Sequence, residues 1–204
     1  MPGGRGPGGY VGLPMPGDDA LLELIRTKGY LHTDTPLQLA SGEWSQDFVD
    51  GKKALAHGDD LRLACELVVA RARAAGIDFD AVGGLTMGAD HLSHGIAMVA
   101  SVSWFTVRKE PKGRGTGKLI EGAELGPGMR ALVVEDVVTT GSSALKAVDT
   151  VAATGATVVG AATLMDRGDA AAAAFAARGI PYVAMLTYAD LGIPPVGGAH
   201  RNAG

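Results

Sequence analysis

The sequence predicts an α/β fold with a central, mostly parallel sheet flanked by helices. From about residue 79 onward, short apolar runs rich in β-branched residues alternate with helical stretches. Such alternation requires right-handed crossovers and a parallel sheet covered on both faces. One run, residues 132–134, ends on two acids, Glu135 and Asp136, and a loop of small polar residues follows. Because ligands of such sheets bind beyond the carboxyl ends of the strands, a binding site is expected there.

The segment before the alternation is expected to form one helix and a small separate lobe. Asp18 and Asp19 can cap a helix that ends at Gly29. Roughly residues 30–52 contain short extended pieces around a Ser-Gly-Glu turn and do not fit the strand–helix alternation. We expect this segment, called the hood below, to lie above the sheet.

The remaining elements follow from the periodicity of the apolar residues. Helices are expected at residues 59–76, 89–100 and 169–178, and from the loop after the acids to residue 154. Strands are expected at residues 79–82, 103–107, 132–134, 157–165 and 182–186.

Composition bounds both fold and function. A chain of 204 residues fits one domain, expected at residues 18–193, between Gly- and Pro-rich ends, 1–17 and 194–204, that are expected to be disordered. The net charge of −4 comes from mixed signs and gives no basic face for nucleic acid. No apolar stretch reaches the length of a membrane span, and the first residues lack the apolar region of a signal peptide. The single cysteine, Cys65, lies in an apolar pattern, so we expect a buried thiol, no intramolecular disulfide and a cytoplasmic protein.

The loop after the acids, Thr-Thr-Gly-Ser-Ser at residues 139–143, has the properties of a phosphate site. Backbone N–H groups at a helix start point at an anion, Thr and Ser hydroxyls add donors, and the helix dipole favours negative charge. Glu135 and Asp136 cannot bind that phosphate, but they suit sugar hydroxyls or a metal-chelated group beside it. The loop lacks the features of a P-loop or a dinucleotide fingerprint. An ordinary β–α turn with two surface acids is the alternative.

A second informative stretch, residues 108–118, contains five cations, three glycines and one proline. Such a composition cannot form a core element. It is either a solvated surface loop or a flexible cationic flap that closes over a polyanion and excludes water. Because it follows a strand whose end faces the expected site, its position favours the flap.

Five stretches together are similar to the orotate phosphoribosyltransferases, which belong to the type I phosphoribosyltransferases and use 5-phosphoribosyl 1-diphosphate (PRPP). They are residues 39–50, 82–89, 107–122, 131–143 and 164–167. The resemblance implies the type I phosphoribosyltransferase fold with a hood and a flap at roughly 108–120. It also implies a pentosyltransferase that makes orotidine 5′-phosphate and diphosphate from PRPP and orotate in pyrimidine (UMP) biosynthesis. A homodimer is implied, with the flap acting across the interface, and Mg²⁺ carried mainly by PRPP and diphosphate, without assigned protein ligands.

The resemblance further implies the residues of the site. Residues 83–89 form the diphosphate-binding turn. PRPP is bound by Arg108, Lys109, Lys112, Arg114, Glu135, Asp136, Val137, Val138, Thr139, Thr140, Gly141, Ser142 and Ser143. The catalytic residues among them are Asp136, Glu135, Lys109 and Lys112. Orotate is contacted by Thr139, Arg167 and Phe48, where the planar guanidinium of Arg167 suits the orotate carboxylate.

The sequence departs from the family in the flap and in the hood. Arg114 stands where the family usually has His, and Arg cannot exchange a proton near neutral pH, although it supplies charge for a diphosphate. Ala40 replaces a lysine of some members, and residues 46–47, Gln-Asp, replace a usual Pro-Tyr pair.

The remaining hypotheses concern a metal site at two histidines and three functions other than that of the orotate enzyme. His91 and His94 share a helix face, but no third ligand is evident, so a metal site there is disfavoured. The alternatives to the orotate enzyme are a phosphoribosyltransferase for another base, a non-catalytic PRPP-binding regulator, and a generic sugar-phosphate-binding module. Arg167 argues against uracil or a purine, which have no carboxylate, and the full flap argues against a regulator.

Overall fold

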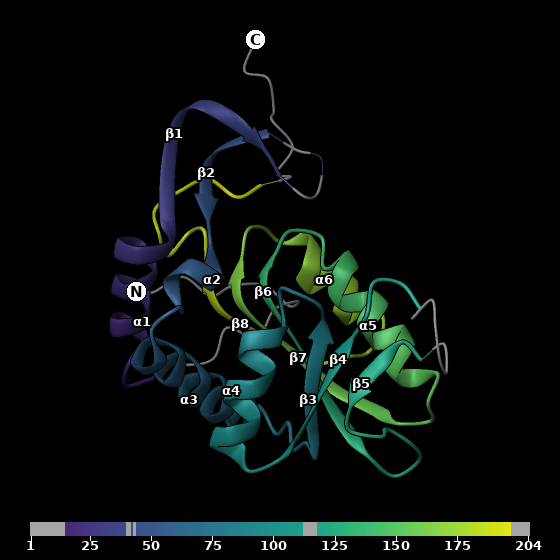
Figure 1. Ribbon diagram of the computed structural model, residues 1–204. Helices are drawn as coiled ribbons and strands as arrows, with labels where there is room; N and C mark the ends of the chain where they lie inside the picture. Colours follow the sequence, from purple (N-terminus) through teal and green to yellow (C-terminus); the bar gives the residue numbers. More distant parts are fainter. Residues whose placement is uncertain (1–14, 40–41, 43, 112–117, 197–204) are drawn as a thin grey trace.

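The computed structural model describes residues 15–39, 42, 44–111 and 118–196. In these ranges the chain forms one six-stranded sheet with helices on both faces and a two-stranded hood above it (Figure 1). No helix in the described ranges is long and apolar enough to cross a membrane.

The six-stranded sheet has the order β5-β4-β3-β6-β7-β8. Its strands are β3 (Ala81–Leu85), β4 (Ser103–Val107), β5 (Ile120–Gly122), β6 (Arg130–Val138), β7 (Thr157–Asp166) and β8 (Tyr182–Thr187). All neighbours pair in parallel except β4 and β5, which are antiparallel. The mostly parallel sheet predicted from the sequence is therefore confirmed, and the short edge strand β5 is an addition.

The helices cover both faces of this sheet. They are α1 (Asp18–Leu24), continued by the π-helical turn η1 (Ile25–Gly29), α2 (Gly51–Ala54), α3 (Gly58–Ala74), α4 (Asp90–Ala100), α5 (Ser142–Ala152) and α6 (Ala170–Ala176). Helices α3 and α4 lie on one face, and α5 and α6 lie on the other (Figure 1).

The core is split by the sheet into two layers. Along β6, Leu132 and Val134 pack with the α3 and α4 side, whereas Ala131 and Val133 pack with the α5 and α6 side. Successive strand residues point to opposite faces, so an unbroken apolar run is what a strand covered on both faces requires.

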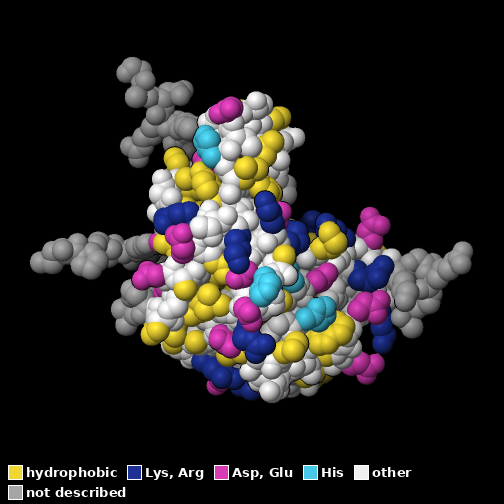
Figure 2. All heavy atoms as spheres, turned by 60° about the vertical axis from the view of Figure 1, so that its left-hand side comes forward, with side chains coloured by type: hydrophobic (Ala, Val, Ile, Leu, Met, Phe, Trp, Pro, Cys, Tyr) yellow, Lys and Arg dark blue, Asp and Glu magenta, His cyan; other side chains and the backbone are white. Residues whose placement is uncertain are grey.

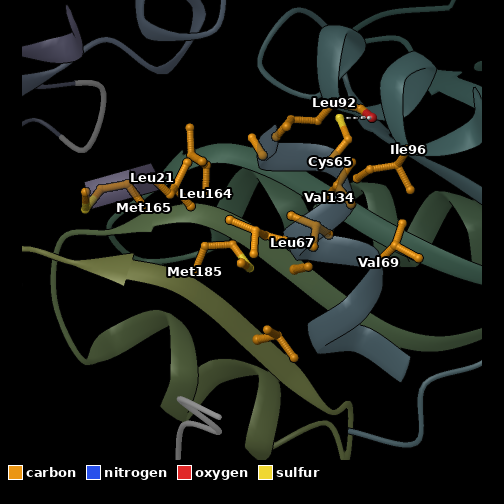
Figure 3. Packing of buried hydrophobic residues seen from close by; sticks show 14 of the residues in the cluster. Leu21, Cys65, Leu67, Val69, Leu92, Ile96, Val134, Leu164, Met165 and Met185 are labelled. Carbon is orange, nitrogen blue, oxygen red and sulfur yellow. Dashed lines mark hydrogen bonds between the residues drawn. The ribbon is translucent and has the colours of Figure 1, made fainter. Parts of the chain in front are cut away.

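The first layer contains the single cysteine. The Cys65 thiol lies 4.0 Å from the carbonyl oxygen of Leu92, among apolar side chains of α3, α4 and the sheet (Figure 3). Burial raises the pKa of the Cys65 thiol to about 12, which keeps the unreactive protonated form at neutral pH. The predicted buried thiol is confirmed.

The hood consists of β1 (Tyr30–Gln38) and β2 (Trp44–Val49), paired antiparallel. Its base is fixed by two hydrogen bonds to the body. The Asp50 N–H donates to the Gly29 carbonyl at 3.0 Å, and the Tyr188 hydroxyl donates to the Asp47 carbonyl at 3.2 Å. The predicted lobe thus stands on the carboxyl-end side of the sheet (Figure 1).

Three predictions about element ends are wrong. The strand expected at residues 79–82 is β3 (Ala81–Leu85), so residues 83–85 of the expected diphosphate-binding turn belong to that strand, where they pair with β4. Strand β6 does not end at the acids, because the β-branched Val137 and Val138 continue the ladder opposite β7. The cap of α1 is Gly17, which lies in the left-handed region at φ 101°, and it makes no side-chain cap. Asp18 lies in the first turn instead, where its Oδ2 accepts from the Met15 N–H at 2.8 Å.

The expected disordered ends overlap the described residues only at 15–17 and 194–196. Val196 is held there, since its N–H donates to the Arg167 carbonyl at 2.7 Å. This differs from the expectation of disorder from residue 194; the rest of both ends lies outside the described residues.

Candidate functional site

The acidic pair lies inside the carboxyl end of β6. Glu135 and Asp136 are each 6% exposed. Although successive strand residues alternate in direction, the two carboxyl groups converge at the glycine turn before α4, where Glu135 Oε1 and Asp136 Oδ1 both approach Gly88. Glu135 lines a small cavity beside the start of α5. Asp136 faces the base of the hood, where its Oδ2 accepts from Lys52 Nζ at 2.8 Å.

Burial and proximity shift the proton affinities of this pair. Burial, followed by the negative charge of Asp136, raises the pKa of the Glu135 carboxyl. Burial alone would lower the pKa of Lys52, but the hydrogen bond and charge of Asp136 outweigh it and raise that pKa. The site therefore holds one carboxyl group that resists ionisation beside an ion pair.

The loop at residues 139–143 closes the small cavity. Gly141 is the N-cap of α5, with a left-handed φ of 73° that favours glycine. The cavity has a volume of about 70 Å³, and it is lined by Glu135, Val137, Val138, Thr139, Thr140, Gly141, Ser142, Ser143 and Arg167. The backbone N–H groups at this helix N-terminus and the hydroxyl groups of the loop favour an anionic group in the cavity.

Arg167 is a buried cation at the edge of the same cavity. The pairing of Val138 with Asp166 between β6 and β7 places Thr139 and Arg167, the next residues, side by side. Arg167 is 7% exposed, and its Nε and Nη1 have no hydrogen-bond partner among the described residues. A buried unpaired guanidinium is costly, so this position favours an anionic ligand.

The glycine-rich turn before α4 abuts the acidic pair. A Cβ added at Gly88 would lie 1.9 Å from Glu135 Oε1 and 2.8 Å from Asp136 Oδ1. The turn is held by Asp90, whose carboxylate accepts from the Thr86 hydroxyl at 2.7 Å. The fold thus brings the turn, the acids, the loop and Arg167 to one edge of the sheet.

The two ends of the basic flap adjoin β4 and β5, which form an antiparallel pair. The Arg108 N–H donates to the Leu119 carbonyl at 2.8 Å. The Arg108 guanidinium lies 3.7 Å from Glu121, away from the cavity lining, and Lys109 is exposed. Lys112 and Arg114 lie outside the described residues.

Asp47, one of the residues that depart from the family pattern, makes hydrogen bonds within the hood. The Asp47 carboxylate accepts from the Tyr30 hydroxyl at 2.7 Å, and Nδ1 of His32 lies 2.8 Å from the same oxygen. Phe48, predicted to contact the base, is half-buried on β2 opposite Leu31 and does not line the small cavity. Ala40 lies outside the described residues.

Sequence reasoning missed Lys52 and the surroundings of His91. Lys52 is 84 positions from Asp136, so no local pattern indicates their contact. His91 Nε2 is buried without a partner among the described residues, and burial lowers the pKa of His91 although Asp136 opposes this. His94 packs edge-on against Trp104, with ring centroids 4.5 Å apart. The described residues contain no group of three His, Cys, Asp or Glu that could hold a metal ion.

Known proteins share this arrangement. Residues 66–174 match the model of the phosphoribosyl transferase domain family. The orotate phosphoribosyltransferase of Corynebacterium glutamicum is 41% identical over 175 residues, which are 85% of this chain and 92% of that protein. The crystal structure of Mycobacterium tuberculosis orotate phosphoribosyltransferase with Fe(III) dicitrate matches with a TM-score of 0.75 and 40% identity, over 87% of this chain and all of that one. The structure of the same enzyme with PRPP matches with a TM-score of 0.71 and 39% identity, over the same shares of the two chains.

The six-stranded sheet and its helices form the fold of the type I phosphoribosyltransferases, a class of pentosyltransferases. The more specific family predicted from the sequence, the orotate phosphoribosyltransferases, is also confirmed. Given the identity and the coverage of its relatives, the chain belongs to the orotate phosphoribosyltransferases.

Proposed function

We propose that the chain transfers the 5-phosphoribosyl group from PRPP to orotate, which gives orotidine 5′-phosphate and diphosphate in pyrimidine biosynthesis. The observation that carries this proposal is the buried Arg167, whose Nε and Nη1 lack partners among the described residues beside the phosphate loop. Orotate offers a carboxylate for two parallel hydrogen bonds from a guanidinium, and uracil and purines do not.

The sugar end of PRPP is assigned to the acidic pair and the loop. The 5-phosphate binds at residues 139–143, where the helix N-terminus and hydroxyl donors favour an anion. Glu135 and Asp136 accept from the ribose hydroxyls. The Asp136 carboxylate also stabilises the positive charge that develops on the ribose as its bond to diphosphate breaks, and that positive charge in turn favours ionisation of Glu135.

The diphosphate end of PRPP is assigned to residues 83–89, which are the end of β3 and the turn at 86–89, and to the flap. Gly88 keeps that turn directly against the acids. Lys109 and Lys112 are proposed to contact the leaving diphosphate, together with Arg108 and Arg114. The substitution of Arg for the usual flap His leaves this position as charge alone, because Arg does not exchange protons near neutral pH.

The base end is assigned to Arg167, Thr139 and Phe48. Thr139 is buried next to Arg167 at the cavity edge, which places its side chain within the same small space. Phe48 is proposed to contact the base from β2 of the hood, where its side chain is half-buried.

Magnesium is proposed to arrive with the substrate. Two carboxylates are present at the site, and the described residues lack a third group for a protein cage. Mg²⁺ prefers substrate phosphates and water with one or two carboxylates, so these residues fit it. When bound, the ion neutralises charge on the leaving diphosphate.

The test is a spectrophotometric assay of purified protein with PRPP, magnesium and a panel of bases. Loss of orotate absorbance, with stoichiometric diphosphate release, is expected for orotate and not for uracil or purines. Turnover of another base and not of orotate would replace the proposed substrate. Heat of PRPP binding without turnover of any base would identify a non-catalytic PRPP-binding regulator.

A further inference from the structure

Lys52 contacts the acidic pair from the hood side, and no role for it follows from the functions assigned above. Its Nζ donates to Asp136 Oδ2 at 2.8 Å, while the Val137 N–H donates to Asp136 Oδ1 at 2.8 Å. Both oxygens of this carboxylate therefore have a donor. Two donors in different directions fix the plane of the carboxylate before any ligand arrives.

The backbone beneath Lys52 is seated on the strand that carries Asp136. A Cβ added at Gly51 would lie 3.1 Å from Asp136 Cβ and 3.3 Å from Leu164 Cδ2. Ala54 and Leu55 are buried, and the Asp50 side chain caps α2 by accepting from the Lys53 N–H at 3.0 Å. Helix α2 is therefore anchored without the Lys52 side chain.

The Lys52 ion pair joins an exposed cation to a buried carboxylate. The Lys52 side chain is 51% exposed and adds little packing to the fold, whereas the Asp136 side chain is 8% exposed. The electrostatic effect of Lys52 is concentrated on the acids, because Asp136 and Glu135 are buried next to each other. Figure 2 shows Lys and Arg side chains gathered where the hood meets the body, close to acidic and His side chains.

We propose that Lys52 is a positioning residue for Asp136, which holds its carboxylate in the orientation that receives the ribose of PRPP and links the base of the hood to the reacting sugar. This rests on the function proposed above. If Lys52 positions Asp136, replacing the cation at position 52 should change the binding and turnover of PRPP and leave the binding of orotate unchanged.

The test compares Lys52→Met, Lys52→Arg and the matched control Lys53→Met. Lys53 is the exposed neighbour on α2. In Lys52→Met, the KM for PRPP is expected to rise and kcat to fall, giving roughly a tenfold loss of kcat/KM, with the KM for orotate unchanged. Lys52→Arg restores most of the loss, and Lys53→Met matches the wild type. A kcat/KM for PRPP within twofold of the wild type in Lys52→Met would overturn the proposal.

Calorimetric titration with PRPP and magnesium tests the coupling independently of the base. Lys52→Met and Asp136→Asn are each expected to weaken the binding of PRPP. The double variant is expected to bind PRPP no more weakly than Asp136→Asn alone. Additive losses would overturn a positioning role, because Lys52 would then act on PRPP by itself. If the wild type binds PRPP but turns over no base, the proposed function fails and this cycle still decides the role of Lys52. Absence of PRPP binding by the wild type would overturn both.

Discussion

Among single residues, Arg167 is expected to decide which base is accepted. The change Arg167→Ala removes a buried guanidinium whose free donors suit a carboxylate. Loss of a charge-assisted bidentate pair is expected to raise the KM for orotate roughly 30-fold or more, with a much smaller effect on PRPP. Steady-state kinetics with each substrate varied measures this split. The control Arg178→Ala removes a half-exposed arginine paired with Asp149, and it should leave both KM values unchanged. If Arg167→Ala raised the KM values for orotate and PRPP equally, the base-site assignment would be contradicted.

Asp136 is expected to carry most of the negative charge of the acidic pair, because the pKa of Glu135 is raised. Asp136→Asn keeps the shape and one acceptor oxygen but removes the negative charge that stabilises the developing charge on the ribose. Turnover is expected to fall by roughly 100-fold or more, whereas the midpoint of thermal unfolding changes by a few degrees. Initial rates and thermal unfolding of the same preparation measure both. Near-full activity of the variant would remove Asp136 from the catalytic residues.

At the scale of elements, the turn before α4 and the end of β6 form one unit. Gly88→Ala would place a methyl group against Glu135 Oε1 and Asp136 Oδ1, so the acids must move. Because the obstructing atoms are ends of side chains, activity is expected to fall at least about tenfold while stability falls by about 1–3 kcal/mol. Kinetics and urea unfolding measure these effects. The control Gly58→Ala has no atom within 4 Å of the added Cβ and should be neutral; unchanged PRPP kinetics in Gly88→Ala would contradict the close approach.

The elements that sequence could predict are those specified by local pattern. The runs on β6 and β7 and the periodicity of α3 and α5 depend on burial of nearby residues, and these elements were found within a few positions. The end of β6 was misplaced, because the acids interrupt the apolar run while the neighbouring strand continues to hold the backbone. The edge strand β5 has three residues and no periodicity that could announce it.

The parts of the candidate site that could be predicted are likewise those specified by local sequence. The acids and the loop at 139–143 are adjacent in sequence, so their grouping follows from one strand end. Lys52 and Gly88 reach the acids from other elements, through contacts set by the packing of α2 and of the turn before α4 on β6. Side-chain contacts over such separations depend on tertiary structure, which a single sequence does not display.

At the scale of the whole molecule, Asp166 makes stability depend on pH. Burial raises the pKa of Asp166 from 3.8 to about 6, although the Gly168 N–H and the Tyr182 hydroxyl both donate to it. The folded state thus binds the proton more tightly than the unfolded state. The stabilisation contributed by Asp166 is therefore fully present below about pH 4 and is lost as pH rises through about 6, on the order of 3 kcal/mol.

Asp166→Asn tests this dependence by urea unfolding at a series of pH values. The difference in unfolding free energy between the variant and the wild type is expected to grow in favour of the variant between about pH 4 and pH 6, and to be constant above. Glu135, whose pKa is also raised, contributes the same sign in both proteins and cancels in the difference. The exposed control Asp34→Asn should show no such trend. A pH-independent difference for Asp166→Asn would contradict the raised pKa.

The sequence resemblance implies a homodimer, and we propose that its interface includes the apolar side chains exposed on α4 and β4. Met98 is 83% exposed and Trp104 is 41% exposed. His94 contacts Trp104 and precedes Met98 by four positions on α4, so all three side chains lie on one surface. This surface belongs to the strand that leads into the flap, which is where a partner must lie if the flap is to reach its site.

Trp104→Glu is therefore expected to halve the mass measured by light scattering at micromolar concentration, because a charge in an apolar interface is costly to desolvate. The flap would then lose the neighbouring site, so activity should fall with the dimer and return at high protein concentration. The control Trp44→Glu changes a more exposed tryptophan, 66% exposed on β2 of the hood, and should leave the mass unchanged. A wild type that is monomeric at every concentration yet fully active would show that the surface on α4 and β4 is not an interface and that each flap serves its own subunit.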